Sequence, residues 1–292
     1  MKQEKGRQLA AGLFAFFPIF LIISIFLLLL LKAFPLLSLK SLPGVLFSSA
    51  WQPQKGQFGL WPFILGTLWV TITAFILAAP LSILTAIYIS DYASGRLKKW
   101  LAPVLDLLAG LPSVIYGMWG ILLIVPLVGK YLAPLFGTYT SGYCVLTAGI
   151  VLAVMILPTI VNVSAEVLSA VPADLKEAAL ALGATRLEVV RHVVLKKSLP
   201  GVAAACVLGL SRAFGETLAV MMVVGNVPVA PTSLFSPAYP LPALLANNYG
   251  EMLSIPGYEA ALNLAAIILL LMVIIFSLGA RLYLTKLGQR SV

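Results

Sequence analysis

Charged residues are scarce in this sequence. Lys and Arg total 19, Asp and Glu total 10, and charged residues make up 10% of the 292 residues, whereas about a quarter of the residues in soluble domains are charged. Hydrophobic residues make up 61%, and the mean hydropathy is +1.05. This composition excludes a soluble globular protein, and we expect the chain to lie in a lipid bilayer.

Residues that build enzymatic and metal sites are also few. The single histidine is His192, and the two cysteines, Cys144 and Cys206, fall within apolar stretches. We therefore expect no disulfide framework, no metal site and no Cys–His nucleophile. The phosphate-binding pattern GxxxxGK[ST] does not occur, so no nucleotide-binding P-loop is expected in this chain. A net charge of +9 would suggest nucleic acid in a soluble protein, but here the basic residues lie between apolar stretches, and no nucleic acid partner is expected.

Apolar stretches long enough to cross a hydrocarbon core of about 30 Å recur along the chain. We expect one all-α integral membrane domain over residues 1–292 with six transmembrane helices at residues 9–31, 61–90, 101–128, 142–164, 200–227 and 258–284. A signal peptide is the alternative for the first stretch, but the stretch is too long and no small-residue cleavage site follows it. In the third stretch, Pro112 and three glycines predict a kinked helix packed closely against its neighbours.

Lys and Arg are distributed unevenly around these stretches. Fourteen of the 19 lie toward the termini or in the loops after the second and fourth stretches. Four lie on the other side: Lys32, Lys40, Lys55 and Lys130. The positive-inside rule therefore predicts a multi-pass protein of the plasma membrane with both termini and residues 166–199 in the cytoplasm.

The cytoplasmic segment 166–199 is expected to form two helices. An acidic first turn at Asp174 begins the first helix, because carboxylates complement the helix dipole, and Gly183 ends it. The second helix is expected over residues 186–197. Small residues in the first helix would allow close approach of another protein, and an amphipathic loop lying on the membrane surface is the alternative.

This segment resembles the EAA loop of the membrane subunits of bacterial ABC importers. The resemblance rests on Glu177, Ala178, Ala179, Gly183 and residues 199–201. It implies a coupling helix that docks into a groove on an ATPase subunit, with the first four of these residues as the docking set. One departure is Lys196, where the family commonly has proline, and Pro200 is expected to leave docking intact.

The fifth apolar stretch carries ionisable residues, which cost about 2.5–3.5 kcal/mol each by insertion scales and indicate a functional site. Arg212 and Glu216 are spaced i, i+4, so on one helix they would share a face and could pair. A buried ion pair that only locks helices together is the structural alternative. Ser211, Thr217 and Asn226 add more polar groups than such a pair requires. Arginine suits an oxyanion because its planar group donates two parallel hydrogen bonds.

Residues 211–220, with Gly225 and Asn226, closely resemble the permease pair of phosphate-specific ABC importers, and are nearer to the C-type permease than to its A-type partner. Residues 108–120 and 244–251 also resemble that family, so the likeness spans essentially the whole chain. It implies the type I ABC importer permease (MetI-like) fold and phosphate translocation through Arg212 and Glu216. Ser211, Thr217 and Asn226 are the further candidates for that pathway.

The same resemblance implies an assembly in a bacterial inner membrane. Its partners would be a second homologous permease subunit, two ATP-binding subunits and an extracytoplasmic phosphate-binding protein. ATP and Mg²⁺ would bind to the ATPase partner, and this chain would bind no cofactor and act as a transport subunit without its own ATPase site.

Three other functions remain open at this point. A permease for another oxyanion such as sulfate would share the fold and partners. A secondary transporter, in which Arg212 and Glu216 are structural, would need no docking segment. A membrane-embedded enzyme would need a nucleophile, a base or a metal cluster. Among weaker candidates, Asp106 either pairs with a basic loop residue or lines an inner gate, and Ser113 and Tyr116 either face the pathway or pack.

Overall fold

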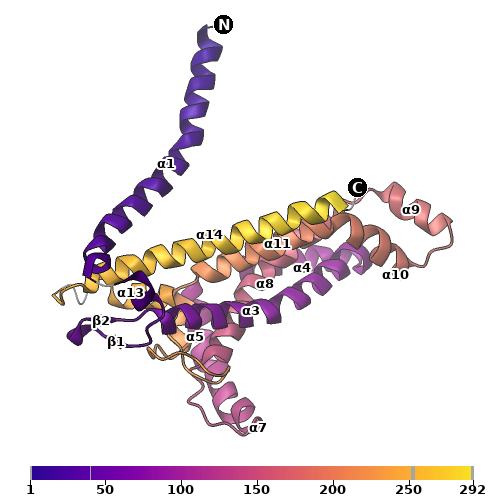
Figure 1. The fold of residues 1–292 in the computed structure, drawn as a ribbon. Helices are drawn as coiled ribbons and strands as arrows, with labels where there is room; N and C mark the ends of the chain where they lie inside the picture. The colour runs from indigo at the N-terminus through magenta and orange to yellow at the C-terminus, as the bar shows by residue number, and fades with distance from the viewer. Residues whose placement is uncertain (1, 40, 251–253, 291–292) are drawn as a thin grey trace. The chain divides into compact units, whose positions relative to one another are not determined.

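The computed structural model describes residues 2–39, 41–250 and 254–290 and is mostly helical (Figure 1). The chain divides into two compact units, each described here by itself. The first comprises residues 1–61 and 247–271, and the second comprises residues 62–246 and 272–292.

Six helical stretches among the described residues are long and apolar enough to cross a membrane. They are Phe16–Ser38, Trp61–Tyr92, Ser113–Leu135, Val145–Ser169, Arg186–Gly215 and Tyr258–Ala280. Their number confirms the expected six spans, and the chain is a multi-pass membrane protein.

The first unit joins the N-terminal helix to a small hairpin. Its elements are α1 (Lys2–Leu39), α2 (Leu42–Leu46), β1 (Trp51–Gln52), the 3₁₀ turn η1 (Pro53–Lys55), β2 (Gln57–Phe58) and the first part of α14 (Tyr258–Arg290). Trp51 and Phe58 pair across the hairpin, and both rings contact Tyr258 at centroid distances of 5.9 and 6.1 Å. Lys32 forms an exposed ion pair of 2.7 Å with Glu259, which ties α1 to α14.

The second unit contains the remaining helices. In chain order they are α3 (Trp61–Ile87), the π-helix η2 (Tyr88–Tyr92), α4 (Gly95–Gly110), α5 (Ser113–Trp119), η3 (Gly120–Ile124), α6 (Val125–Leu127), η4 (Val128–Leu132), α7 (Ala133–Leu135), α8 (Val145–Ser169), α9 (Ala173–Ala181), α10 (Arg186–Glu188), η5 (Val189–Val194), α11 (Leu195–Gly215), α12 (Leu218–Val223), α13 (Leu241–Asn248) and the rest of α14.

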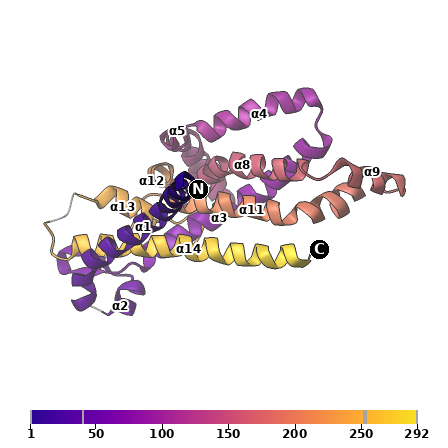
Figure 2. The same cartoon turned by 90° about the horizontal axis from the view of Figure 1, so that it is seen from above.

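The core of the second unit lies around α8, which packs most extensively against α11. The two helices run side by side in both main views (Figures 1 and 2). Gly209 of α11 allows this approach, because a Cβ there would lie 2.5 Å from Cγ1 of the fully buried Ile160 of α8. The close packing of these two helices fixes the residues that they carry.

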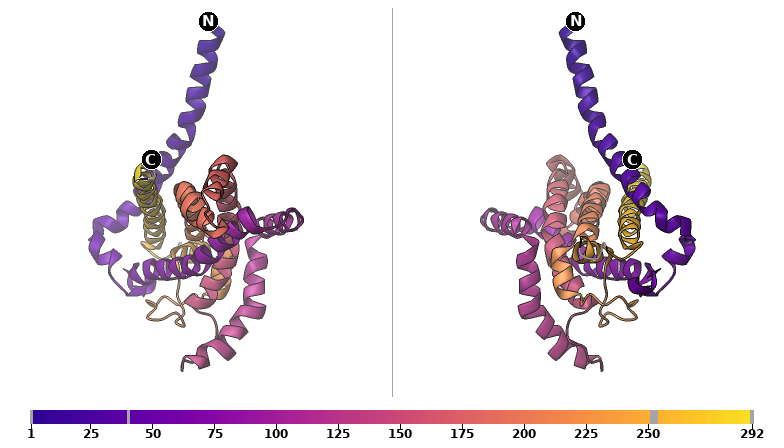
Figure 3. Two further views of the ribbon diagram at one scale, coloured as in Figure 1. Left: turned by 90° about the vertical axis from the view of Figure 1, so that its right-hand side faces the viewer. Right: turned by 90° about the vertical axis from the view of Figure 1, so that its left-hand side faces the viewer.

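The expected span over residues 101–128 is two separate helices, which corrects the prediction of one kinked helix. Helix α4 ends at Gly110, Leu111 and Pro112 are extended with ψ near 136° and 140°, and α5 begins at Ser113. Proline disfavours the helical conformation of the residue before it, so the chain turns sharply here (Figure 3). The membrane-length stretch is Ser113–Leu135.

Two of the three glycines in this stretch lie against neighbouring helices, as expected from the sequence. A Cβ on Gly117 would overlap Sδ of Met222, and one on Gly120 would lie 2.7 Å from a methyl carbon of Val151. The third, Gly110, has open space around it. Close packing at Gly117 and Gly120 brings the start of the third span against α8 and α12.

The fifth span also differs from the expected range 200–227. The helix begins at Arg186, continues through η5 and α11 without a loop, and ends at Gly215. A capping box at its start, formed by Thr185 and Glu188, satisfies backbone N–H groups that would otherwise lack partners. After Gly215 the chain is extended at Glu216, and a separate helix, α12, follows.

Candidate functional site

Arg212 lies three residues before the end of α11 and beside the middle of α8. Its neighbour on α8 is Thr159, which is roughly 15 Å along the helix axis from the Ser169 end and roughly 21 Å from the Val145 end, at 1.5 Å per residue. The Arg212 side chain is exposed in the single chain. A cation at this depth is costly in hydrocarbon, so its exposed side requires water or another protein chain.

The hydrogen bonds of Arg212 all go to neutral acceptors among the described residues. Nη1 donates to Oγ1 of Thr159 at 2.8 Å, and Nη2 donates to the carbonyl oxygen of Ala109 at 3.4 Å. The guanidinium therefore joins α11 to α8 and to the end of α4. Neither acceptor neutralises its charge, which leaves a cation available to an anion.

A second pair of polar residues lies one helical turn away. Nδ2 of Asn162 on α8 donates to Oδ1 of Asp106 on α4 at 3.3 Å. Because Thr159 and Asn162 are spaced i, i+3, they lie on the same face of α8. Asp106 forms no ion pair with the basic residues that the structure describes. The structure thus brings Asp106 to the neighbourhood of Arg212 rather than to a basic loop.

Tyr116 of α5 contacts the last turns of α4. Its ring is buried, and its hydroxyl donates to the carbonyl oxygen of Leu108 at 2.6 Å. This bond holds α5 against α4 across the turn at Pro112. Ser113, the other weak candidate on α5, is half-buried. Of the two alternatives for Tyr116, facing the pathway or packing in the core, the structure shows packing.

The expected pairing of Arg212 with Glu216 is wrong. The i, i+4 argument assumes one continuous helix, but α11 ends at Gly215 and Glu216 has extended dihedral angles of φ −72° and ψ 124°. Neither of the two ion pairs among the described residues contains either side chain. Instead, Oε1 of Glu216 accepts a hydrogen bond from the N–H of Ala219 at 3.3 Å, which caps the start of α12.

The other three predicted pathway residues do not gather around Arg212. The Ser211 hydroxyl lies 3.2 Å from that of Ser277 on α14, and Thr217 donates to the carbonyl of Gly215 at 3.3 Å. Asn226 donates to the carbonyl of Met221 at 2.8 Å. It lines a cavity of about 370 Å³ together with Ser141, Tyr143, Met221, Met222, Gly225, Val227 and Pro237. The structure therefore distributes the five residues over four places: Arg212 beside α8, Ser211 beside α14, Glu216 and Thr217 between α11 and α12, and Asn226 at this cavity.

Sequence reasoning missed the two groups that hold Arg212, namely Thr159 and the carbonyl of Ala109, and it also missed Asn162, which bonds to Asp106. A signal for Thr159 and Asn162 was present, because they are polar residues spaced i, i+3 in the mainly apolar helix α8. The carbonyl of Ala109 left no such signal, since its availability depends on the end of α4 at Gly110.

The predicted docking residues lie on an exposed helix at one end of the second unit (Figures 1 and 2). Helix α9 has no buried residue, and Glu177, Ala178 and Gly183 are exposed, whereas Ala179 packs inward against an apolar cluster. Gly183 has φ +88°, a left-handed conformation that favours glycine and ends the helix. Leu182, beside it, is 90% exposed.

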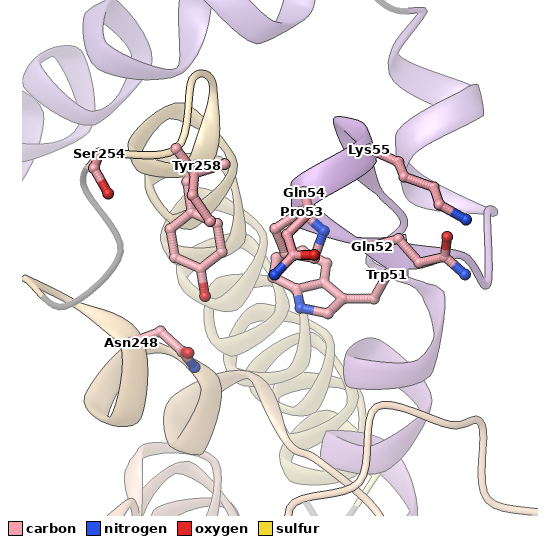
Figure 4. Close-up of a pocket in the computed structure, with 9 residues that line it drawn as sticks. Trp51, Gln52, Pro53, Gln54, Lys55, Asn248, Ser254 and Tyr258 are labelled. Atoms are coloured by element: carbon pink, nitrogen blue, oxygen red, sulfur yellow. The ribbon is translucent and has the colours of Figure 1, made fainter.

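A further cavity of about 540 Å³ lies in the first unit (Figure 4). It is lined by Trp51, Gln52, Pro53, Gln54, Lys55, Asn248, Ser254, Ile255 and Tyr258. The Lys55 ammonium points away from the Tyr258 ring in this view. Among the described residues, no group of three or more His, Cys, Asp and Glu could hold a metal ion.

These features define a mostly helical, multi-pass membrane protein with an exposed arginine beside the middle of α8 and an exposed helix, α9. The family model for binding-protein-dependent transport system inner membrane components matches residues 78–290. The chain belongs to this family.

Named relatives share much of the chain. It is 36% identical over 265 residues, 85% of this chain and 81% of the relative, to the "Phosphate transport system permease protein PstC" of Xylella fastidiosa (strain 9a5c). It is 35% identical over 82% of its length and 79% of the relative to the "Probable phosphate transport system permease protein PstC" of Methanocaldococcus jannaschii. It is 42% identical to the "Probable ABC transporter permease protein YqgH" of Bacillus subtilis, over 70% of this chain and 66% of that protein.

A solved structure supports the fold. The MetNI methionine ABC transporter in an inward-facing conformation has a chain that matches with a TM-score of 0.59 and 19% identity, covering 78% of this chain and 97% of that chain. At this identity the likeness concerns the fold alone, and it agrees with the type I importer permease fold expected from the sequence.

Proposed function

We propose that this chain is the permease subunit through which an ATP-driven importer moves inorganic phosphate into the cell by alternating access. The observation that carries the proposal is the guanidinium of Arg212, which lies exposed beside the middle of α8 and is held only by neutral acceptors among the described residues. The printed names of the relatives support phosphate as the cargo.

Phosphate would bind to Arg212 by replacing its present acceptors. Hydrogen bonds between ionised partners are roughly twice as strong as neutral ones, and a guanidinium can donate two in parallel to one oxyanion. The Thr159 hydroxyl, now an acceptor at 2.8 Å, would then be free to donate to a phosphate oxygen. The site is therefore occupied by weak internal bonds until a stronger anionic acceptor arrives.

The break between α11 and α12 gives Glu216 and Thr217 a different role from the one expected. Glu216 caps α12, and Thr217 bonds to Gly215, so we assign both to holding the break three residues after Arg212. Ser211 would keep α11 against α14, and Asn226 would line the pathway at the cavity beside Met221.

The assembly would follow the family. A second homologous permease subunit would cover the exposed side of Arg212, and two ATP-binding subunits would take the docking set of Glu177, Ala178, Ala179 and Gly183. An extracytoplasmic phosphate-binding protein would deliver the anion. ATP and Mg²⁺ would bind to the ATPase subunits, with no ATPase site on this chain, and both termini would lie in the cytoplasm.

The test is uptake of labelled phosphate by cells that carry Arg212→Gln. We expect at least a tenfold loss, because hydrogen bonds to charged groups contribute about 1.5–3 kcal/mol. Arg96→Gln is the control, since Arg96 is also exposed but lies at the other end of α4 from Ala109. Near-normal uptake by Arg212→Gln at normal membrane abundance would reject the site, and equal competition by sulfate would reject phosphate as the specific cargo.

A further inference from the structure

Asp91 at the end of η2 forms the one largely buried ion pair among the described residues. Nζ of Lys176 on α9 lies 2.7 Å from Oδ1 of Asp91, and the two side chains are 25% and 8% exposed. Oδ2 of Asp91 is buried and has no hydrogen-bond partner in the described part of the chain. Lys176 is therefore the group that compensates this carboxylate.

Arg186 reaches the same residue from α10. Its Nη2 donates to the backbone carbonyl of Asp91, and its guanidinium lies over the ring of Tyr92 at 5.3 Å from the centroid. The capping box of Thr185 fixes the start of the helix that carries Arg186. Both helices of the docking segment, α9 and α10, are thus fastened to one residue at the end of η2.

The neighbouring Ser90 extends these contacts to two further helices. Its carbonyl accepts a hydrogen bond of 2.8 Å from Nζ of Lys98 on α4. Its hydroxyl lies 3.3 Å from that of Ser169 at the end of α8. Ser90 and Asp91 therefore connect the end of the second membrane span to α4, α8, α9 and α10.

The docking segment is not adjacent to α3 in the sequence, so only non-covalent contacts can join the two. The docking segment is covalently continuous with α8 through residues 170–172 and with α11 through η5, but α3 and η2 lie about 80 residues earlier in the sequence. Apolar contacts from Ala86, Ile83 and Ile87 also join α3 to the segment, yet apolar packing is non-directional. Directional bonds at Asp91 are what would fix one position of the segment against α3.

We propose that Asp91 is a positioning residue that makes the docking segment and the end of the second span move as one body, so that a displacement of α9 by its partner reaches α3. Lys176 and Arg186 transmit the displacement through the Asp91 carboxylate and carbonyl. The proposal rests on the proposed function, because its consequence is the coupling of ATP hydrolysis to phosphate transport.

Transport measurements give the first test. The importer complex is reconstituted in vesicles, and phosphate uptake and ATP hydrolysis are measured on the same preparation for Asp91→Asn, Lys176→Gln and the double variant. Removal of one partner of a largely buried ion pair leaves the other charge uncompensated, so we expect each single variant to weaken the connection and to lower uptake per ATP by at least about fivefold. The double variant should recover most of it, because it leaves no unpaired charge and two amides can still bond.

The matched control is Lys32→Gln, which breaks an ion pair of the same 2.7 Å length with Glu259 outside the docking segment and should leave the ratio unchanged. A purely structural role for Asp91 would lower uptake and hydrolysis in the same proportion. That result, or a double variant as uncoupled as the single variants, would overturn the proposal.

A distance measurement tests the connection of α9 to η2 through Asp91 without measuring phosphate transport. Spin labels are placed at Ala173→Cys and Tyr88→Cys, both at exposed positions, after replacement of Cys144 and Cys206 by alanine. We expect one narrow distance distribution that stays the same with and without ATP, and a broader one when Asp91→Asn is added. If the distance changes with nucleotide in the chain that keeps Asp91, the proposal that α9 and the end of the second span move as one body is wrong. A complex that moves no phosphate but keeps this distance would contradict only the proposed function.

Discussion

Nη1 of Arg212 donates a 2.8 Å hydrogen bond to the hydroxyl of Thr159, joining two helices that are each long and apolar enough to cross a membrane. The bond uses a charged donor on a neutral acceptor near the middle of α8. Such an arrangement holds the guanidinium in place without satisfying its charge, and an arriving oxyanion can therefore compete for it.

Removal of the Thr159 hydroxyl should slow transport. In Thr159→Val the side chain keeps its shape, but the guanidinium loses its shorter bond and its fixed direction, and we expect phosphate uptake to fall about tenfold. Thr159→Ser keeps the hydroxyl and should stay within about threefold of the unmodified protein, measured as initial uptake rates at equal membrane abundance. Full activity of Thr159→Val would show that the bond has no part in transport.

Close packing at Gly209 should be visible in stability. A methyl group there would meet Ile160 at 2.5 Å, whereas nothing lies within 4 Å of a Cβ on Gly279. Alanine improves helix propensity over glycine by about 1 kcal/mol at either position, but overpacking costs about 1–3 kcal/mol. Thermal unfolding in detergent should therefore show a lower Tm for Gly209→Ala and an equal or higher Tm for Gly279→Ala. A Tm for Gly209→Ala at or above that of Gly279→Ala would mean that the two helices separate easily.

The exposed leucine beside Gly183 should be needed for the ATPase partner. Leu182 is 90% exposed, so Leu182→Glu removes little internal packing and should leave the amount of folded protein unchanged. We expect it to abolish co-purification of the ATP-binding subunits, because it places a charge in an apolar contact. Tyr139→Glu, at a position 93% exposed in the loop after α7, is the control and should co-purify normally. Retention of the ATPase by Leu182→Glu would move the docking surface elsewhere.

The capping box of Thr185 should set the local stability of the second docking helix. Loss of an N-cap side chain costs about 1 kcal/mol, which corresponds to about fivefold faster opening. In Thr185→Ala, amide hydrogen exchange over residues 186–194 should accelerate by about this factor. Exchange over α4, whose own cap at Ser94 is intact, serves as the internal reference. Unchanged exchange over residues 186–194 would mean that packing of η5 alone holds this helix.

The number of spans and the helix that ends before Gly183 could be predicted from the sequence because both depend on local pattern. Long uncharged runs identify membrane helices, and Gly183 marks a helix end with φ +88°. The third span was placed too early, because hydropathy does not show that Leu111 and Pro112 separate two helices.

The site was only partly predictable for a similar reason. Arg212 stands out as a charge in an apolar run, but its relation to Glu216 depended on a helix that ends one residue before that carboxylate. The partners Thr159 and Ala109 come from helices distant in the sequence. Likewise, Lys176 and Asp91 are 85 residues apart, and only the tertiary fold brings them together.

The most direct measurement is the water accessibility of position 212 in the assembled importer. Arg212→Cys, in a chain whose Cys144 and Cys206 are replaced by alanine, is treated with a membrane-impermeant thiol reagent in open membranes, with and without ATP. An aqueous anion path predicts modification in at least one nucleotide state, with a rate that changes between the two. Modification only by a lipid-soluble reagent, in both states, would place this position against lipid and contradict the account.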